Sequence, residues 1–151
     1  MSFLTRLPIQ LDGLIAEVAG PDRGGIASFL GTVRDHHQGR AVRGLEYTAY
    51  EPMAEETCRE ILLEAAARWP VQVTLRHRLG ELAIGDVAVA VVAAGGHRDE
   101  AFAACRYVIE ELKGRVPVWK RETFVDGTVE WVNASQQAIG SGQSAMGETL
   151  E

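Results

Sequence analysis

The stretch from Val87 to Ala94 constrains the fold of this chain more than any other segment. All of its residues are valine or alanine, and the pair Gly95-Gly96 follows it directly. An uninterrupted apolar run that ends at glycine is typical of a central strand covered on both faces. The run is also far shorter than the roughly 20 residues needed to span a bilayer. We therefore predict a sheet with layers packed on both sides, and no association with a membrane.

The segments around this run predict strands and helices that interleave, with hairpins among them. Alternation of apolar and polar residues indicates strands, apolar stripes at helical spacing indicate helices, and proline or glycine marks their ends. The predicted elements are a short strand over 4–10, a helix capped by Asp12 and ending at Val18, strands over 25–33, 45–50, 71–77 and 87–94, helices over 52–69 and 99–113, and a hairpin of 118–124 with 128–132. The polar run 34–40 is expected to be a long connection. This mixture predicts an α+β fold with a mixed or antiparallel sheet.

Length and composition predict one domain. A chain of 151 residues, 46% of them apolar, fits the usual size of about 100 to 200 residues and can bury a core. We assign this domain to residues 1–132. Residues 133–151 are rich in Gly, Ser, Gln and Ala without periodicity, which predicts a flexible C-terminal tail. The N-terminus lacks the pattern of a signal peptide, so we expect a soluble cytoplasmic protein.

The two lysines stand out against the rest of the charge distribution. The formal net charge is −6, which should repel nucleic acid unless cations gather locally. Of 15 basic residues only Lys113 and Lys120 are lysine, and Arg115 and Arg121 accompany them. The pKa of a lysine falls readily near other cations or on burial, so lysine can act as an acid, a base or a nucleophile. A cationic helix end would explain Lys113 equally well, but it does not explain Lys120. We expect Trp119 to face the core and to turn Lys120 to the opposite side of its strand.

Two other polar clusters are candidates for binding an anion. Gly95-Gly96-His97-Arg98 joins a strand to a helix N-terminus, where free amides and the helix dipole favour an anion. A simple turn with a solvated Arg98 explains this motif about as well. Arg34, His36 and His37 follow a buried strand, a common position for binding residues, although a polar loop of this kind is more often plain surface.

The two cysteines favour a structural role. Cys58 and Cys105 each lie in a helical apolar stripe, where a cysteine is more often a small core residue than a persulfide carrier. Neither has a cysteine or histidine at metal-ligand spacing. We therefore expect no structural zinc, no disulfide and no resident cofactor.

Five segments in order give the chain a resemblance to a known family. They are Phe29 to His36, Tyr50 to Met53, His77 to Leu82 with Gly85-Asp86, Gly96 to Arg98, and Leu112-Lys113 with Pro117 to Glu122. Together they resemble the large subunit of molybdopterin synthase over about residues 24–132. The resemblance implies an α/β hammerhead-type fold with an added β subdomain.

The resemblance also implies an activity and partners. The family converts cyclic pyranopterin monophosphate into molybdopterin, a step of molybdenum cofactor biosynthesis. Two large subunits form a homodimer within a heterotetramer, and each binds a small ubiquitin-like subunit whose C-terminal thiocarboxylate supplies the sulfur. This agrees with cysteines that serve only the core, and it implies a sulfurtransferase.

Matched position by position, the family's functional residues fall on six residues of this chain. The resemblance implies substrate binding by Phe29, Arg34, His97 and Arg98, and catalysis by Lys113 and Lys120. The chain departs from the family pattern in its Gly95-Gly96 pair and in a tail without basic residues. Two other functions remain open: a non-catalytic module that binds a small anion or a ubiquitin-like tail, and an RNA-binding domain that stacks bases on Trp119 and Tyr107.

Overall fold

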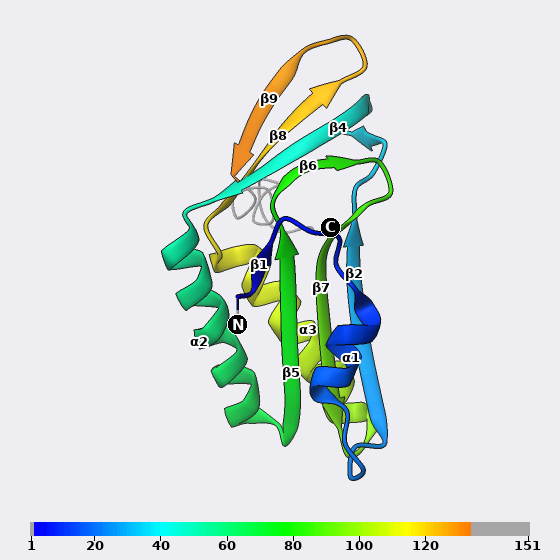
Figure 1. Ribbon diagram of the computed structural model, residues 1–151, viewed down its shortest axis with the longest axis vertical. Helices are drawn as coiled ribbons and strands as arrows, with labels where there is room; N and C mark the ends of the chain where they lie inside the picture. The colour runs from blue at the N-terminus through cyan, green and yellow to red at the C-terminus, as the bar shows by residue number, and fades with distance from the viewer. Residues whose placement is uncertain (1, 134–151) are drawn as a thin grey trace.

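The structure is a computed structural model that describes residues 2–133, and it contains two β-sheets and three α-helices within that range. The predicted flexible tail, 133–151, lies outside the described residues except for Asn133, which ends the last strand. Figure 1 shows the two sheets one above the other, with the helices against the lower one. This arrangement confirms the predicted α+β class and the added β subdomain.

The first sheet carries the predicted central strand. Its order is β1 (Leu4–Thr5), β5 (Val71–Arg78), β7 (Val87–Gly95) and β2 (Gly25–Thr32). β1 runs parallel to β5, and the other neighbours are antiparallel. α2 (Glu51–Arg68) and α3 (Arg98–Arg115) cover one face, and α1 (Leu11–Val18) covers the other. β7 is therefore enclosed on both faces, as its continuous apolar sequence predicts.

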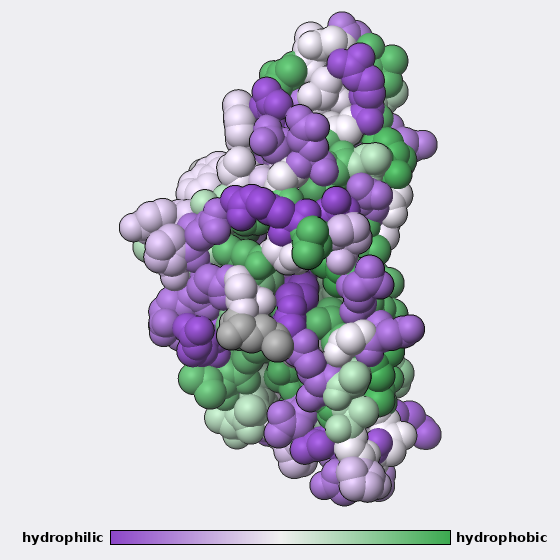
Figure 2. Space-filling model, in the orientation of Figure 1, coloured by the Kyte–Doolittle hydropathy of each residue, from purple (hydrophilic) through white to green (hydrophobic). Residues whose placement is uncertain are grey.

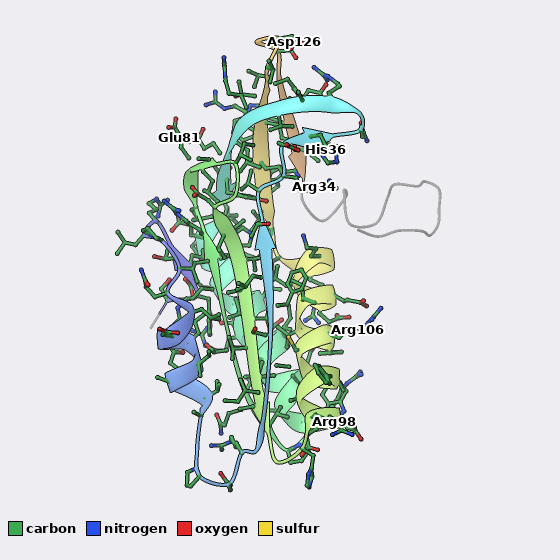
Figure 3. All side chains as sticks on the ribbon, turned by 90° about the vertical axis from the view of Figure 1, so that its right-hand side faces the viewer. Arg34, His36, Glu81, Arg98, Arg106 and Asp126 are labelled. Carbon is green, nitrogen blue, oxygen red and sulfur yellow. The ribbon has the colours of Figure 1, made fainter. Side chains whose placement is uncertain are left out.

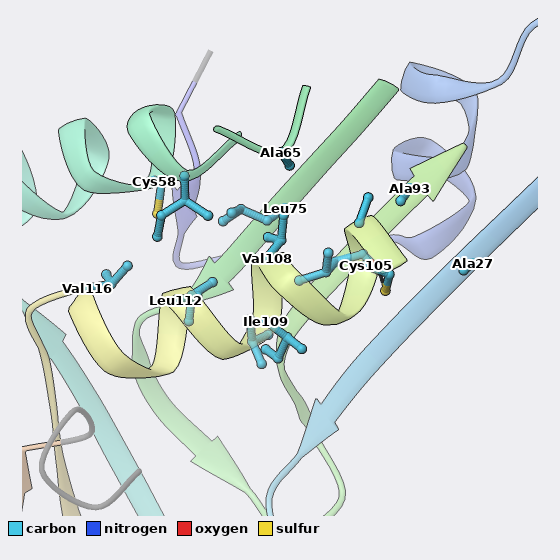
Figure 4. Packing of buried hydrophobic residues seen from close by; sticks show 14 of the residues in the cluster. Ala27, Cys58, Ala65, Leu75, Ala93, Cys105, Val108, Ile109, Leu112 and Val116 are labelled. Atoms are coloured by element: carbon cyan, nitrogen blue, oxygen red, sulfur yellow. Dashed lines mark hydrogen bonds between the residues drawn. The ribbon is translucent and has the colours of Figure 1, made fainter. Parts of the chain in front are cut away.

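The main core lies between the first sheet and the helices α2 and α3 (Figure 4). α3 contributes a stripe of Cys105, Val108 and Leu112, whose spacing of three and four residues puts all three side chains on one face of the helix. Leu75 of β5 and Cys58 of α2 meet this stripe and are completely buried. Packing of this kind fixes the C-terminal end of α3 against the sheet.

The second sheet is antiparallel and lies beyond the C-terminal ends of β2 and β5. Its path is β3 (His36–His37), β4 (Arg40–Ala49), β8 (Val118–Phe124) and β9 (Val129–Asn133), and β6 (Gly80–Ala83) pairs with β4 as well. In Figure 1 this sheet forms the upper part of the molecule. It connects the chain that leaves β2 with the chain that leaves α3.

Several predicted boundaries are wrong, and the strand predicted over 4–10 ends at Thr5. Residues 34–40 contain a hairpin in place of a plain connection: Gln38 and Gly39 both have positive φ, at 53° and 80°, and let β3 fold back on β4. The predicted strand 45–50 therefore begins earlier, at Arg40. Asp12 does not cap α1, because the cap position is Gln10 and Asp12 lies in the first turn.

β2 is an exposed edge strand of the first sheet. It pairs with β7 on one side, and its sequence carries no charged residue. Ile26, Phe29 and Leu30 are 38–44% exposed along it. Figure 2 shows apolar surface down the right-hand side of the lower half, where Figure 1 places β2 and α1. Separately, none of the described helices is long and apolar enough to cross a membrane.

Candidate functional site

A cavity of about 350 Å³ lies where the two sheets meet the end of α3. Four of the six predicted site residues line it: Phe29 and Arg34 from β2 and its exit, Lys113 from α3, and Lys120 from β8. Figure 3 shows Arg34 and His36 at the top of β2, beside the second sheet. The structure thus brings both lysines and one predicted arginine to a single concave site.

Lys120 faces this cavity, and the predicted orientation of its neighbour is wrong. Trp119 is 36% exposed on the outer side of β8, whereas the side chain of Lys120 is only 12% exposed. Side chains do alternate along the strand, and the inner face of β8 carries Lys120 and Glu122 between the buried Val118 and Phe124. The large apolar ring of Trp119 therefore indicated the wrong face.

A buried carboxylate holds Lys120 in place. Glu122 is 4% exposed, and its Oε2 lies 3.3 Å from Nζ of Lys120. Its Oε1 lies 2.5 Å from Nδ1 of His37. Burial lowers the pKa of Lys120; the charge and hydrogen bond of Glu122 oppose this effect, and the positive charge of Arg34 adds to it. The net result is a lysine that releases its proton more readily than a solvated one.

His77 and Tyr47 form the wall of the cavity behind the lysines. Their rings meet edge to face with centroids 4.9 Å apart. Nδ1–H of His77 donates a hydrogen bond to the carbonyl oxygen of Arg78, 2.9 Å away. Burial lowers the pKa of His77 to about 4, and the positive charge of Lys113 contributes to this shift. His77 is therefore neutral near pH 7.

Sequence reasoning missed several residues of this site. The sequence predicts no role for His77, Tyr47 or Glu122, although all three line the cavity. A signal for Glu122 is present in the sequence, because a carboxylate two positions after a lysine in a strand shares its face. Tyr47 has no such signal, since its pairing with Lys120 depends on the register of β4 and β8.

His97 and Arg98 lie at the opposite end of the molecule. They begin α3, and Lys113 lies near its end, so roughly 22 Å of helix separates Arg98 from Lys113 at about 1.5 Å per residue. Figure 3 shows Arg98 at the bottom of the view and Arg34 near the top. Glu100 packs over Gly95, where an added Cβ would lie 2.5 Å from its Cγ. A single copy of the chain does not bring His97 and Arg98 to the cavity.

The thiols and the metal-binding side chains give no second reactive centre in residues 2–133. Cys58 and Cys105 are buried, and burial raises their pKa values to about 12 and about 11. Thiolate, the reactive form, is therefore scarce near pH 7. Over the same residues, no group of three His, Cys, Asp or Glu side chains is arranged to hold a metal ion.

The arrangement of charge defines what the cavity can do. One guanidinium and two ammonium groups line it, and a buried carboxylate, Glu122, offsets part of their charge. The remaining positive charge attracts anionic ligands such as phosphates and carboxylates. A lysine with a lowered pKa can also donate or accept a proton there. The site is therefore suited to bind an anion and to move protons next to it.

Comparison with known proteins gives matches that cover most of the chain. The family described as "MoaE protein" matches residues 4–115. Molybdopterin synthase catalytic subunit 1 of Mycobacterium tuberculosis is 46% identical over 130 residues, which cover 85% of this chain and 88% of that protein. The crystal structure of molybdopterin synthase from Staphylococcus aureus superposes with a TM-score of 0.83 at 34% identity, covering 87% of this chain and 96% of that one. A complex of subunits 1 and 2 of molybdopterin-converting factor from Helicobacter pylori shares the fold at 23% identity, with a TM-score of 0.64 and coverage of 89% and 87%.

Proposed function

The chain belongs to the MoaE protein family, and from this premise we propose that it is the catalytic subunit of a molybdopterin synthase. It transfers sulfur from the C-terminal thiocarboxylate of a small ubiquitin-like subunit to cyclic pyranopterin monophosphate, and so forms the dithiolene of molybdopterin. In this assignment the protein is a sulfurtransferase of the cytoplasm. No resident cofactor takes part.

One observation carries the assignment: Arg34, Lys113 and Lys120 line the same cavity although they come from three different elements. The substrate carries a phosphate and the sulfur donor ends in an anionic thiocarboxylate, so both reactants need cations. Arg34 binds the substrate by charge-assisted hydrogen bonds, and Phe29, which is 38% exposed, offers its ring to the pterin. Lys113 and Lys120 stabilise the negative charge that develops at the reacting carbons and carry the protons.

The sulfur has to come from outside this chain. Both of its cysteines are buried with raised pKa values, so neither is suited to carry a persulfide. A thiocarboxylated peptide tail brings its own sulfur and needs only an open, cationic cavity. The relative from Helicobacter pylori is described as a complex of two subunits, which agrees with a small partner of this kind.

A second copy of the chain can supply His97 and Arg98. β2 is an uncharged edge strand with exposed apolar residues, and an edge of this kind readily pairs with another strand. Antiparallel pairing of β2 with β2 of a second copy would join the two sheets about a two-fold axis. The start of one β2 would then lie opposite the end of the other.

This pairing would place the two halves of the predicted site together. An added Cβ on Gly25, at the start of β2, would lie only 3.0 Å from the backbone nitrogen of Arg98, so the start of β2 touches the start of α3. Arg34 and the cavity lie just beyond the end of β2. The cavity of one copy would thus receive His97 and Arg98 from the other. We propose this homodimer as the core of a heterotetramer with two small subunits.

Reconstitution tests the proposed function. The protein is mixed with a thiocarboxylated small subunit and cyclic pyranopterin monophosphate, and the dithiolene product is followed by mass spectrometry. We expect product to form in proportion to the thiocarboxylate consumed. Binding of the pterin without any transfer of sulfur would contradict the proposal and would favour a non-catalytic anion-binding module.

A further inference from the structure

The side chain of His37 lies on the buried face of the second sheet, whereas that of its neighbour His36 is exposed. The side chain of His36 is 61% exposed, and its Nδ1 lies 2.9 Å from Oδ1 of the neighbouring Asp35. The side chain of His37 is 12% exposed. The hairpin of β3 with β4 turns it inward, because successive side chains of a strand point to opposite faces.

A continuous chain of polar contacts joins His37 to Lys120. Nδ1 of His37 lies 2.5 Å from Oε1 of Glu122, and Nζ of Lys120 lies 3.3 Å from Oε2 of the same carboxylate. The side chains of His37, Glu122 and Lys120 are only 12%, 4% and 12% exposed. A carboxylate this deeply buried depends on its hydrogen-bond donors, so each donor affects how the other is held.

We propose that His37 is a positioning residue that fixes the place and the charge state of Lys120 through the shared carboxylate of Glu122. The N–H of His37 occupies one carboxylate oxygen and leaves the other for the lysine. It also draws electron density from the carboxylate, which weakens the attraction of Glu122 for the ammonium group. Its effect on turnover rests on the proposed function, but its effect on Lys120 does not.

The charges around these three side chains decide whether loss of His37 raises or lowers the pKa of Lys120. Without His37, the whole negative charge of Glu122 acts on Lys120, so the ammonium form becomes more stable. The other titratable or charged side chains that line the cavity are Arg34, His36, Tyr47, His77 and Lys113. All five side chains are present in the wild type and in each His37 variant, so the comparison isolates the contact of His37 with Glu122.

The composition of the chain makes the measurement direct. Lys113 and Lys120 are its only lysines, so protein labelled with 13C-lysine gives two ε-carbon signals in an NMR spectrum. Lys113→Arg and Lys120→Arg assign them. We expect His37→Ala to raise the titration midpoint of Lys120 by roughly 0.5 to 1 pH unit. His37→Asn, whose amide places a donor near the position of Nδ1, should keep the midpoint close to that of the wild type.

Turnover gives the second readout. His37→Ala should lower kcat about 10-fold with little change in the KM for the pterin, and His37→Asn should restore most of it. Arg106→Ala, at an 81% exposed side chain on α3 outside the cavity, is the control and should change neither quantity. Should His37→Ala fail to fold, His37→Phe, which fills the space of the ring without a hydrogen-bond donor, carries the same expectation as His37→Ala.

Two results would overturn the proposal. One is a Lys120 midpoint that stays in place in His37→Ala. The other is an equal shift in His37→Ala and His37→Asn, which would show that the hydrogen bond has no part in it. A wild-type protein without turnover would contradict the proposed function instead, and the titration would still decide the role of His37.

Discussion

Tyr47 and Lys120 lie directly opposite each other on the neighbouring strands β4 and β8, and both line the cavity. Burial, together with the negative charge of Glu122, raises the pKa of Tyr47 to about 12. The phenol therefore keeps its proton near pH 7, and the neutral His77 lies against it. This wall of the cavity thus presents two uncharged hydrogen-bonding groups near pH 7.

Replacement of Lys120 should nearly abolish product formation. Lys120→Ala removes a cation that we assign to charge stabilisation and proton transfer, and loss of such a group costs about 100-fold or more in rate. Product is quantified by mass spectrometry, and thermal unfolding followed by circular dichroism checks the fold. Arg106→Ala, which removes an equal charge from an 81% exposed side chain on α3, should turn over normally. Turnover by Lys120→Ala at the wild-type rate would refute the assignment.

Two inactive variants should complement each other in a shared dimer. If each site takes Lys120 from one copy and Arg98 from the other, a mixed dimer of Lys120→Ala and Arg98→Ala has one intact site. Random reassociation then restores about a quarter of the wild-type rate. A mixture of Lys120→Ala with Lys113→Ala should remain inactive, because these two residues belong to the same copy's cavity. Equal recovery in both mixtures would rule out a site divided between copies.

A charge on the edge strand should separate the two copies. Ile26→Lys puts an ammonium on β2, where Ile26 is 44% exposed, and lysine on an edge opposes strand pairing. Light scattering coupled to size-exclusion chromatography should then report the 16.4 kDa monomer, with activity reduced about 10-fold or more. Leu63→Lys, at a 65% exposed position on α2, should stay dimeric. A dimeric Ile26→Lys would place the interface elsewhere.

His77 should make the protein sensitive to mild acid. Its pKa falls from 6.5 to about 4 on folding, so below pH 6.5 the unfolded chain binds a proton that the folded chain does not. This contribution to stability is present above pH 6.5 and is lost as the pH falls towards 4, up to about 3 kcal/mol. His77→Asn, which cannot titrate, should lose less stability over this range. Urea unfolding at pH 7.0, 5.5 and 4.5 measures the difference, and parallel pH profiles would argue against it.

Elements with a strong local pattern could be predicted from the sequence. β7 is predicted because every residue of the run is apolar, and α2 is predicted because prolines lie at both of its ends. The β3–β4 hairpin was missed, because Gln38 at a φ of 53° is a residue that seldom marks a turn of this kind. Sequence patterns thus locate an element well where its own residues, such as an apolar run or a flanking proline, determine its conformation.

The candidate site could be predicted only in part. The neighbourhood of Lys113 and Lys120 is foreseeable, since a short segment joins the end of a helix to a strand. The resemblance groups His97 and Arg98 with the lysines in one site, although the predicted helix 99–113 already separates Arg98 from Lys113 by roughly 22 Å. The inward turn of Lys120 depends on a carboxylate and on strand register, both of which are tertiary effects. The roles of all six site residues stay predictions.

The length of β2 sets the spacing between the two groups of site residues that a dimer would combine. Its eight residues extend roughly 25 Å at about 3.3 Å each, from the contact with α3 to the rim of the cavity. One inserted residue would move these groups apart by a single step and would also invert which side chains point towards the helices. The number of residues in β2 therefore sets the geometry of the assembled site. Substitutions in β2 should be tolerated far better than insertions or deletions.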